Sequence, residues 1–150
     1  METPQIKAPA IKDWHAHVYF DAATRDVAWA LRERIEKDFD IVMGRFHERP
    51  VGPHPMFSYQ VHFQPPQFGP LISWLTLNHG DLTVFIHPNT GQDLEDHRDR
   101  ALWIGKSIPL VLSIFTDKGY INQRAGLERR AALVERLYAV SPDEDVIILN

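Results

Sequence analysis

Residues 14–20 read WHAHVYF, a short run in which side chains of two kinds alternate. Alternation with a period of two is typical of a β-strand that buries one face. The more apolar set consists of Trp14, Ala16, Val18 and Phe20. The opposite face then carries His15, His17 and Tyr19, so the pattern predicts a strand with two histidines on one surface.

The chain after this strand predicts the element order β-α-β-β-α-β. A first helix is expected at 22–38, where Val27, Leu31 and Ile35 have helical spacing behind Asp21, a favourable N-cap. The next segments predict a strand, another strand, a helix and a last strand, at residues 40–48, 56–63, 65–80 and 81–87. This order is that of the ferredoxin-like split βαβ unit, so we predict an α+β sandwich with an antiparallel sheet.

The segments before and after these elements are predicted to belong to the same single domain. Residues 1–12 contain two prolines and no periodic pattern, so we expect a flexible leader there. The domain itself is expected at 13–115, with a short helix capped by Asp93 near its end. Residues 116–150 are predicted to form a C-terminal extension of the same domain, with an amphipathic helix at 126–139.

The predicted topology gathers histidines on the sheet face that the helices leave open. In such a sandwich both helices cover one face, and the strand order is 4-1-3-2. The alternation of the third and fourth strands leaves His62 and His87 on the other face, together with His15 and His17. Metal–nitrogen bonds of about 2.0–2.2 Å allow side chains from three neighbouring strands to converge on one ion.

The composition excludes several classes of function. The 150 residues carry a net charge of −4 and no basic run, which argues against nucleic-acid binding. We find neither the apolar core of a signal peptide nor a run long enough for a bilayer, so we expect a soluble cytoplasmic protein without a membrane partner. The chain has no cysteine, so any metal must be held by histidine, aspartate or glutamate.

The histidines have an ordinary interpretation as well. Histidines are common on solvated sheet faces, and an HxH pair alone is a weak signal of a metal site. We interpret His47 and His79 as loop or cap residues, with His79 in the last turn of its helix, where a cation is favourable. The coincidence of several histidines on one predicted face is what favours a metal.

Four segments in a fixed order also resemble a known family. They read WHAHVYF, RPVGPHP, LNHGDLTVFIHPNTG and DLEDHRDRALWIGKSIPLVLSIF, and they lie within residues 13–115. In this order and at these separations they are similar to the DOPA 4,5-dioxygenase family of small extradiol ring-cleaving enzymes. The resemblance implies cleavage of a catechol ring with O2 at a non-heme Fe(II). The histidines that it singles out are His17, His54, His87 and His97.

The strand pattern and the resemblance disagree over one metal ligand. Strand geometry favours His62, whereas the family segment GPHP points to His54 in the turn before that strand. We follow the family and predict His17, His54 and His87 as the metal ligands, with His62 in reserve. We find no Asp or Glu clearly on the open face, so the site is either all-histidine or completed by a more distant carboxylate from Asp93, Glu95 or Asp96.

The expected chemistry gives further residues a role. A catechol that binds iron must lose a proton, and a later step needs an acid, so we predict His15 or His97 for these tasks. Tyr19 and Gln60 are candidates for hydrogen bonds to substrate oxygens. A substrate carboxylate would need a cation, for which the candidates are Arg45 and Arg49. The native metal is predicted to be Fe(II), with zinc or nickel as possible substitutes after purification.

Two other classes of function fit the same pattern. A ferredoxin-like module could bind a small molecule or metal without turnover, with its open face closed by a second subunit. A structural protein could simply solvate the histidine face or pack it against a partner. We also predict a homodimer, because Tyr19, Phe85 and Met56 would leave apolar surface on the open face.

Overall fold

The computed structural model describes residues 8–115, and a central strand organises them. Strand β1 (Asp13–Phe20) pairs antiparallel with β3 (Phe57–Phe63) on one side and with β4 (Thr83–Asn89) on the other. The predicted leader falls largely outside the described residues. The predicted C-terminal extension and its helix lie wholly outside them.

Within the described residues, the sheet has five antiparallel strands in the order β2-β3-β1-β4-β5. The four predicted strands therefore lie in the predicted order, and β5 (Leu102–Ile104) adds a fifth at the edge beyond β4. This strand falls in a stretch for which we expected only a loop and a short helix. The class is α+β, and the more specific ferredoxin-like assignment stays a prediction.

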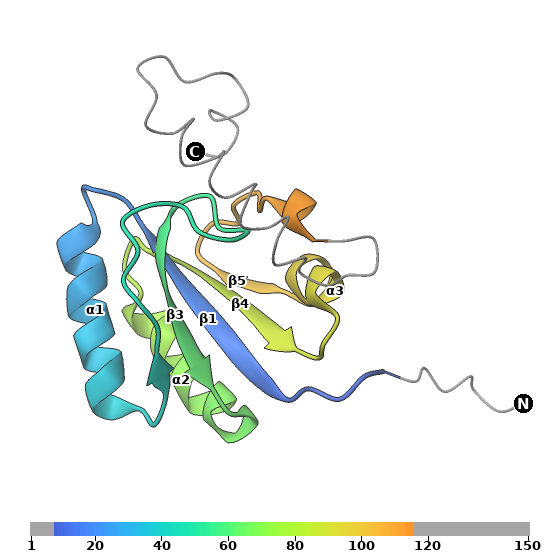
Figure 1. Ribbon diagram of the computed structural model, residues 1–150. Helices are drawn as coiled ribbons and strands as arrows, with labels where there is room; N and C mark the ends of the chain where they lie inside the picture. The colour runs from blue at the N-terminus through green and yellow to red at the C-terminus, as the bar shows by residue number, and fades with distance from the viewer. Residues whose placement is uncertain (1–7, 116–150) are drawn as a thin grey trace, which may run out of the picture.

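Two helices cover one face of the sheet. They are α1 (Arg25–Asp38) and α2 (Phe68–Asn78), the latter preceded by the short 3-10 helix η1 (Pro65–Gln67). Figure 1 shows both beside the strands that they cover. The core between these layers contains the apolar set that alternation predicted, namely Ala16, Val18, Phe20, Tyr59, Val61, Phe63, Val84 and Ile86. The predicted burial of alternate strand residues is therefore confirmed.

Helix α1 buries a slightly different stripe from the predicted one. Leu31 and Ile35 are buried as expected, but Val27 is 56% exposed and Ala28 takes its place. Positions 28, 31 and 35 form one stripe at helical spacing, whereas Val27 lies beyond the Leu31 edge of this stripe, about 100° around the helix axis from Ala28. The helix also starts at Arg25, because Asp21 accepts hydrogen bonds from Thr24 in a turn before it.

Strand β2 (Val42–Met43) is much shorter than the predicted strand at 40–48. Met43 lies opposite Val61, and continuing that register would put Phe46 opposite Ser58. His47 occupies that position instead, as an isolated bridge. The chain therefore carries one extra residue between the two pairings, as in a β-bulge, and the regular ladder ends at Met43.

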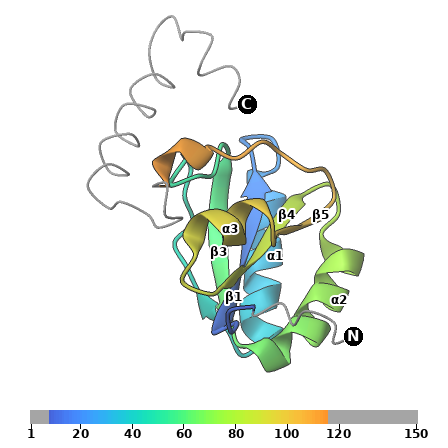
Figure 2. The ribbon, with the colours of Figure 1, turned by 90° about the vertical axis from the view of Figure 1, so that its right-hand side faces the viewer.

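The other sheet face is covered by the chain itself. Its cover consists of residues 50–55, helix α3 (Asp93–Arg98) and the stretch that leads to η2 (Leu112–Ile114). In Figure 1 the strands lie between α1 and α3, and in Figure 2 between α2 and η2. We expected an open face here, so this expectation is wrong.

This cover buries two of the apolar residues on which we based the predicted homodimer. Tyr19 and Phe85 are buried, and Phe85 packs against Trp103 of β5 and against His97 of α3. The homodimer stays a prediction without that argument. No helix among residues 8–115 has both the length and the apolar character of a bilayer-spanning segment.

Candidate functional site

A cavity of about 310 Å³ lies on the sheet face away from α1 and α2. Strands β1, β3 and β4 form its floor, and the Pro-rich segment 50–55 and helix α3 form its walls. Its lining histidines are His15, His17, His47, His54, His87 and His97. The cavity therefore collects every histidine that we predicted as a ligand or a catalytic group.

His17 and His87 bring two ring nitrogens close together. Their Nε2 atoms are 3.1 Å apart, and the two rings are nearly parallel, with centroids separated by 5.2 Å. Two nitrogens bound to one ion at about 2.1 Å, at roughly a right angle, lie about 3 Å apart. His87 Nδ1–H donates to the Pro88 carbonyl at 2.9 Å, which leaves Nε2 as the nitrogen for a metal.

The electrostatic environment keeps this pair neutral. Burial lowers the pKa of His17 well below its usual value, and the neighbouring His54 and His87 lower it further. Burial does the same to the pKa of His87, with His97 as the next cause. A metal binds the unprotonated imidazole, so both side chains are held in the form that a metal requires.

His54 reaches the cavity from a turn. Residues 51–54 close with a hydrogen bond of 3.0 Å from His54 N–H to the Val51 carbonyl, and Gly52 has φ 55°. The His54 ring packs 4.0 Å from the ring of His17, and its Nδ1 shares a 2.6 Å hydrogen bond with the Tyr19 hydroxyl. In the tautomer that presents Nε2 to a metal, His54 Nδ1–H donates to the Tyr19 oxygen.

His15 and His97 both lie beside His87. The ring of His97 lies 4.0 Å from that of His87, and its Nδ1–H donates to the Asp93 carbonyl at 2.6 Å. Burial is the main cause that lowers the pKa of His97, and it lowers the pKa of His15 to about 4. A general acid or base is most effective when its pKa lies near the working pH. Both rings are instead neutral at pH 7, the form that accepts a proton.

Ligand atoms of His15, His17 and His87 all lie within 4.8 Å of one another. A second such group consists of Asp13, His15 and His62, at the edge of the same face. His54 belongs to neither group by this distance, although its ring contacts His17. His15 is therefore common to both groups of potential metal ligands.

Asp13 corrects our expectation that no carboxylate lies on this face. The predicted strand began at Trp14, but β1 begins at Asp13, whose backbone pairs with Asn89. Alternation then places Asp13 on the face of His15. Extending the alternation by one residue would have found it. Asp96, by contrast, is a buried carboxylate that bonds Thr90 and Arg100.

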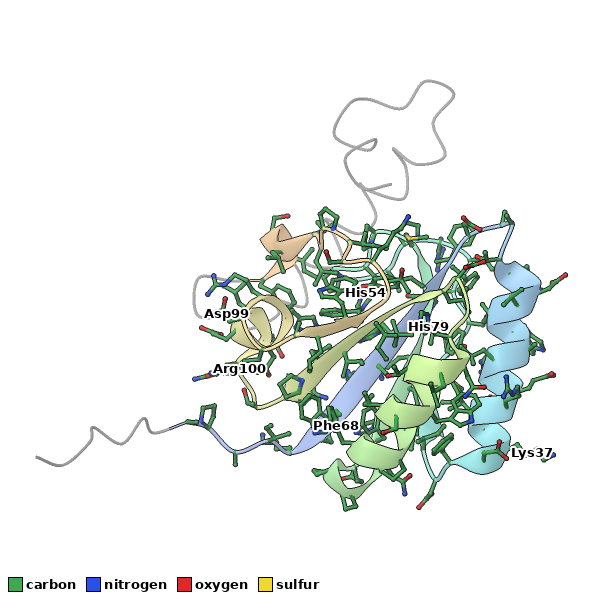
Figure 3. All side chains as sticks on the ribbon, turned by 180° about the vertical axis from the view of Figure 1, so that it is seen from behind. Lys37, His54, Phe68, His79, Asp99 and Arg100 are labelled. Carbon is green, nitrogen blue, oxygen red and sulfur yellow. The ribbon has the colours of Figure 1, made fainter. Side chains whose placement is uncertain are left out.

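Other predicted residues are distributed between the cavity and the surface. Gln60 and Asp93 line the cavity, whereas Arg45 and Arg49 do not. His79 follows the last residue of α2, where Figure 3 labels it, and its ring Nδ1–H donates to the Leu82 carbonyl. His47 also lines the cavity, so our interpretation of it as an ordinary loop residue missed a site residue. Its place follows from the extra residue after β2, which the sequence pattern did not reveal.

Comparison with known proteins identifies the family of this chain. The model of the Dopa 4,5-dioxygenase family matches residues 14–114, which include the strands, the cavity and its histidines. The chain belongs to the Dopa 4,5-dioxygenase family. The predicted resemblance is therefore confirmed, and the chain is an oxygenase-family protein that carries histidine clusters suited to a metal.

This family member is also similar to individual proteins, one of which is named as a DOPA 4,5-dioxygenase. The DOPA 4,5-dioxygenase of Amanita muscaria is 38% identical over 112 residues, which cover 69% of this chain and 49% of that protein. An uncharacterised 21.2 kDa protein of Botryotinia fuckeliana is 40% identical over 110 residues, covering 65% of this chain and 60% of that one. The matched part is therefore only about half to three fifths of these relatives.

A solved structure is also similar. The crystal structure of a candidate dioxygenase from Nostoc punctiforme shares 45% sequence identity with this family member, with a TM-score of 0.68. The match covers 69% of this chain and 90% of the Nostoc chain.

Proposed function

We propose that this chain is an extradiol dioxygenase, which opens a catechol or related dihydroxyphenyl compound with O2 at a non-heme Fe(II). The proposed ligands are His17, His54 and His87. The observation that carries the proposal is the distance of 3.1 Å between the Nε2 atoms of His17 and His87. Both residues line the cavity, and the chain belongs to a dioxygenase family. Two unprotonated imidazoles at that separation fit one divalent ion.

The donor set suits this metal and this chemistry. Imidazoles accept several divalent first-row metals, so zinc or nickel can replace iron after purification. Bound Fe(II) supplies adjacent open positions for both catechol oxygens and O2, and it is redox-active where zinc is not. The cavity of about 310 Å³ is at the lower end of the usual range for small-molecule sites and fits a single aromatic ring.

The chain's own residues provide binding and proton transfer. His15 and His97 are neutral at pH 7 and lie at the cavity, so each can accept a catechol proton and return it later. Tyr19 orients His54 through their shared hydrogen bond. We also keep Tyr19 as a candidate catalytic residue, which would donate a hydrogen bond to a substrate oxygen. Gln60 on the cavity floor can hydrogen-bond a substrate oxygen.

The experiment is anaerobic reconstitution of the purified protein with Fe(II), followed by addition of a catechol and O2. Ring cleavage gives a yellow semialdehyde, which supports the proposal. Iron and catechol binding without colour would identify a binding module without turnover, and absence of iron uptake would favour a structural role. The cytoplasmic location of the protein stays a prediction.

Variants separate the proposed ligands from the reserve residue. His17→Ala, His54→Ala and His87→Ala should each lose most bound iron and nearly all ring cleavage, because each leaves only two protein ligands. His79→Ala is the matched control outside the cavity and should keep both. If His54→Ala keeps iron and cleavage while His62→Ala loses both, His62 is the third ligand and our assignment of His54 is wrong.

A further inference from the structure

The edge of the histidine face carries a carboxylate that the proposed iron centre does not use. Asp13, His15 and His62 lie there, and their ligand atoms are all within 4.8 Å of one another. We propose that these three side chains form a second site for a divalent transition-metal cation, separate from the centre of His17, His54 and His87. Two imidazoles and one carboxylate are an established ligand set for Fe(II) and for zinc.

The sheet register builds this group. His15 on β1 lies directly opposite His62 on β3, and their ring centroids are 5.1 Å apart. Asp13 is two residues before His15 on the same strand and therefore shares its face. The side chains of Asp13 and His62 are 26% and 30% exposed, so the group lies at the edge of the sheet, next to solvent. The rigid ladder of β1 and β3 fixes their spacing before any ion arrives.

The contact between Asp13 and His62 has the spacing expected of two ligands. Asp13 Oδ2 and His62 Nε2 are 3.0 Å apart, at the distance of an ion pair, yet this buried Nε2 makes no well-aligned hydrogen bond within residues 8–115. Two ligand atoms on one ion at about 2.1 Å have this separation. Asn89 Nδ2–H donates to Asp13 Oδ1 at 2.7 Å, which orients the carboxylate with Oδ2 toward the histidines.

The charge of the group also suits a cation. Burial opposes ionisation of Asp13, but the hydrogen bond from Asn89 and the proximity of His62 hold its pKa below the usual value. The group thus offers a negatively charged ligand to a divalent ion.

His15 gives the second site a consequence for turnover. Its ring lies 5.1 Å from the rings of both His62 and His87, so it stands between the two clusters. A cation held by Asp13, His15 and His62 binds the lone pair of the His15 ring. His15 can then no longer accept a proton from the substrate. Inhibition by excess metal follows from this. This consequence and the second equivalent expected in the titration below rest on the proposed function.

The test is calorimetric titration of the metal-free full chain with Zn²⁺, together with metal analysis after dialysis. We expect two equivalents for the wild type. Asp13→Asn and His62→Gln should each lose one equivalent, and His87→Gln should lose the other. Asn89→Ala removes no ligand but frees the Asp13 carboxylate, so it should weaken the Asp13-dependent equivalent about tenfold.

Matched controls remove the same chemical groups elsewhere. Asp99→Asn neutralises an exposed carboxylate paired with Arg98, and His79→Gln removes an imidazole at the end of α2. Both should keep two equivalents, and circular dichroism checks that each variant is folded. Because Asn89→Ala keeps all three ligands, it tests the site even if a ligand variant fails to fold.

The outcomes separate this proposal from the proposed function. A single wild-type equivalent that Asp13→Asn and His62→Gln leave unchanged would overturn the second site. A single equivalent lost in Asp13→Asn but kept in His87→Gln would support the Asp13 site and contradict the proposed iron centre. Two equivalents with the expected losses support the second site even if reconstituted protein cleaves no catechol.

Discussion

Tyr19 and His54 are 35 residues apart in the chain, yet the Tyr19 hydroxyl lies 2.6 Å from Nδ1 of His54. Tyr19 comes from the central strand β1, and His54 from the turn that covers the sheet. Both side chains are buried. This hydrogen bond holds a loop histidine over a strand histidine, His17, at a ring distance of 4.0 Å.

Tyr19→Phe removes this hydrogen bond and keeps the ring. If His54 is a ligand, loss of its orienting partner should weaken Fe(II) binding about 10- to 100-fold. Equilibrium dialysis with Fe(II) under anaerobic conditions measures the affinity. An unchanged affinity would show that His54 needs no orientation by Tyr19 or does not bind the metal.

Tyr59→Phe is the control for this change. Tyr59 is also buried on a strand, but its hydroxyl donates to the Ala28 carbonyl on the helix-covered face, at 2.9 Å. Its loss should cost about 1 kcal/mol of unfolding free energy without any change in iron affinity. Urea unfolding and the same dialysis measure the two effects.

Gly52→Ala tests the turn that carries His54. Gly52 has φ 55°, in the left-handed region where a Cβ costs about 1–2 kcal/mol. We expect urea unfolding to report destabilisation of that size. Gly69→Ala is the control with the opposite sign, since Gly69 lies in α2 and a Cβ there meets nothing within 4 Å. It should stabilise the protein by up to about 1 kcal/mol.

Asp96→Ala tests the buried carboxylate that ties α3 to the chain on either side of it. Asp96 is buried, accepts hydrogen bonds from the Thr90 N–H and hydroxyl, and pairs with Arg100 at 2.9 Å. Its removal leaves these donors without their acceptor and should cost about 2–4 kcal/mol in urea unfolding. Asp99→Ala removes an exposed carboxylate next to Arg98, and its unfolding midpoint should be nearly that of the wild type.

His47→Ala tests the cavity residue that sequence reasoning missed. His47 lines the cavity but belongs to neither group of closely spaced ligand atoms. We therefore expect the variant to keep its iron and to raise the KM for a catechol several-fold, with a smaller change in kcat. Loss of iron would instead make His47 a ligand, and unchanged kinetics would return it to the role of a loop residue.

The sequence by itself determined the faces of the strands. Alternation placed His15, His17, His62 and His87 on one surface and the apolar set on the other, and both placements hold in the sheet. This works because the side-chain period of a strand is local, so a few residues suffice to assign every face. The positions of β1, β3 and β4 followed from the same pattern, and the order in the sheet followed from known topology rules.

Tertiary structure alone decided what covers that face. The Pro-rich turn reaches the cavity through the Tyr19–His54 bond and a backbone bond from Val111 to Pro53. His47 enters the lining because one extra residue follows β2. Such placements depend on contacts between segments far apart in the chain, and no local periodicity encodes them. The histidine face could therefore be predicted from the residues, whereas its enclosure into a cavity could only be seen in the folded chain.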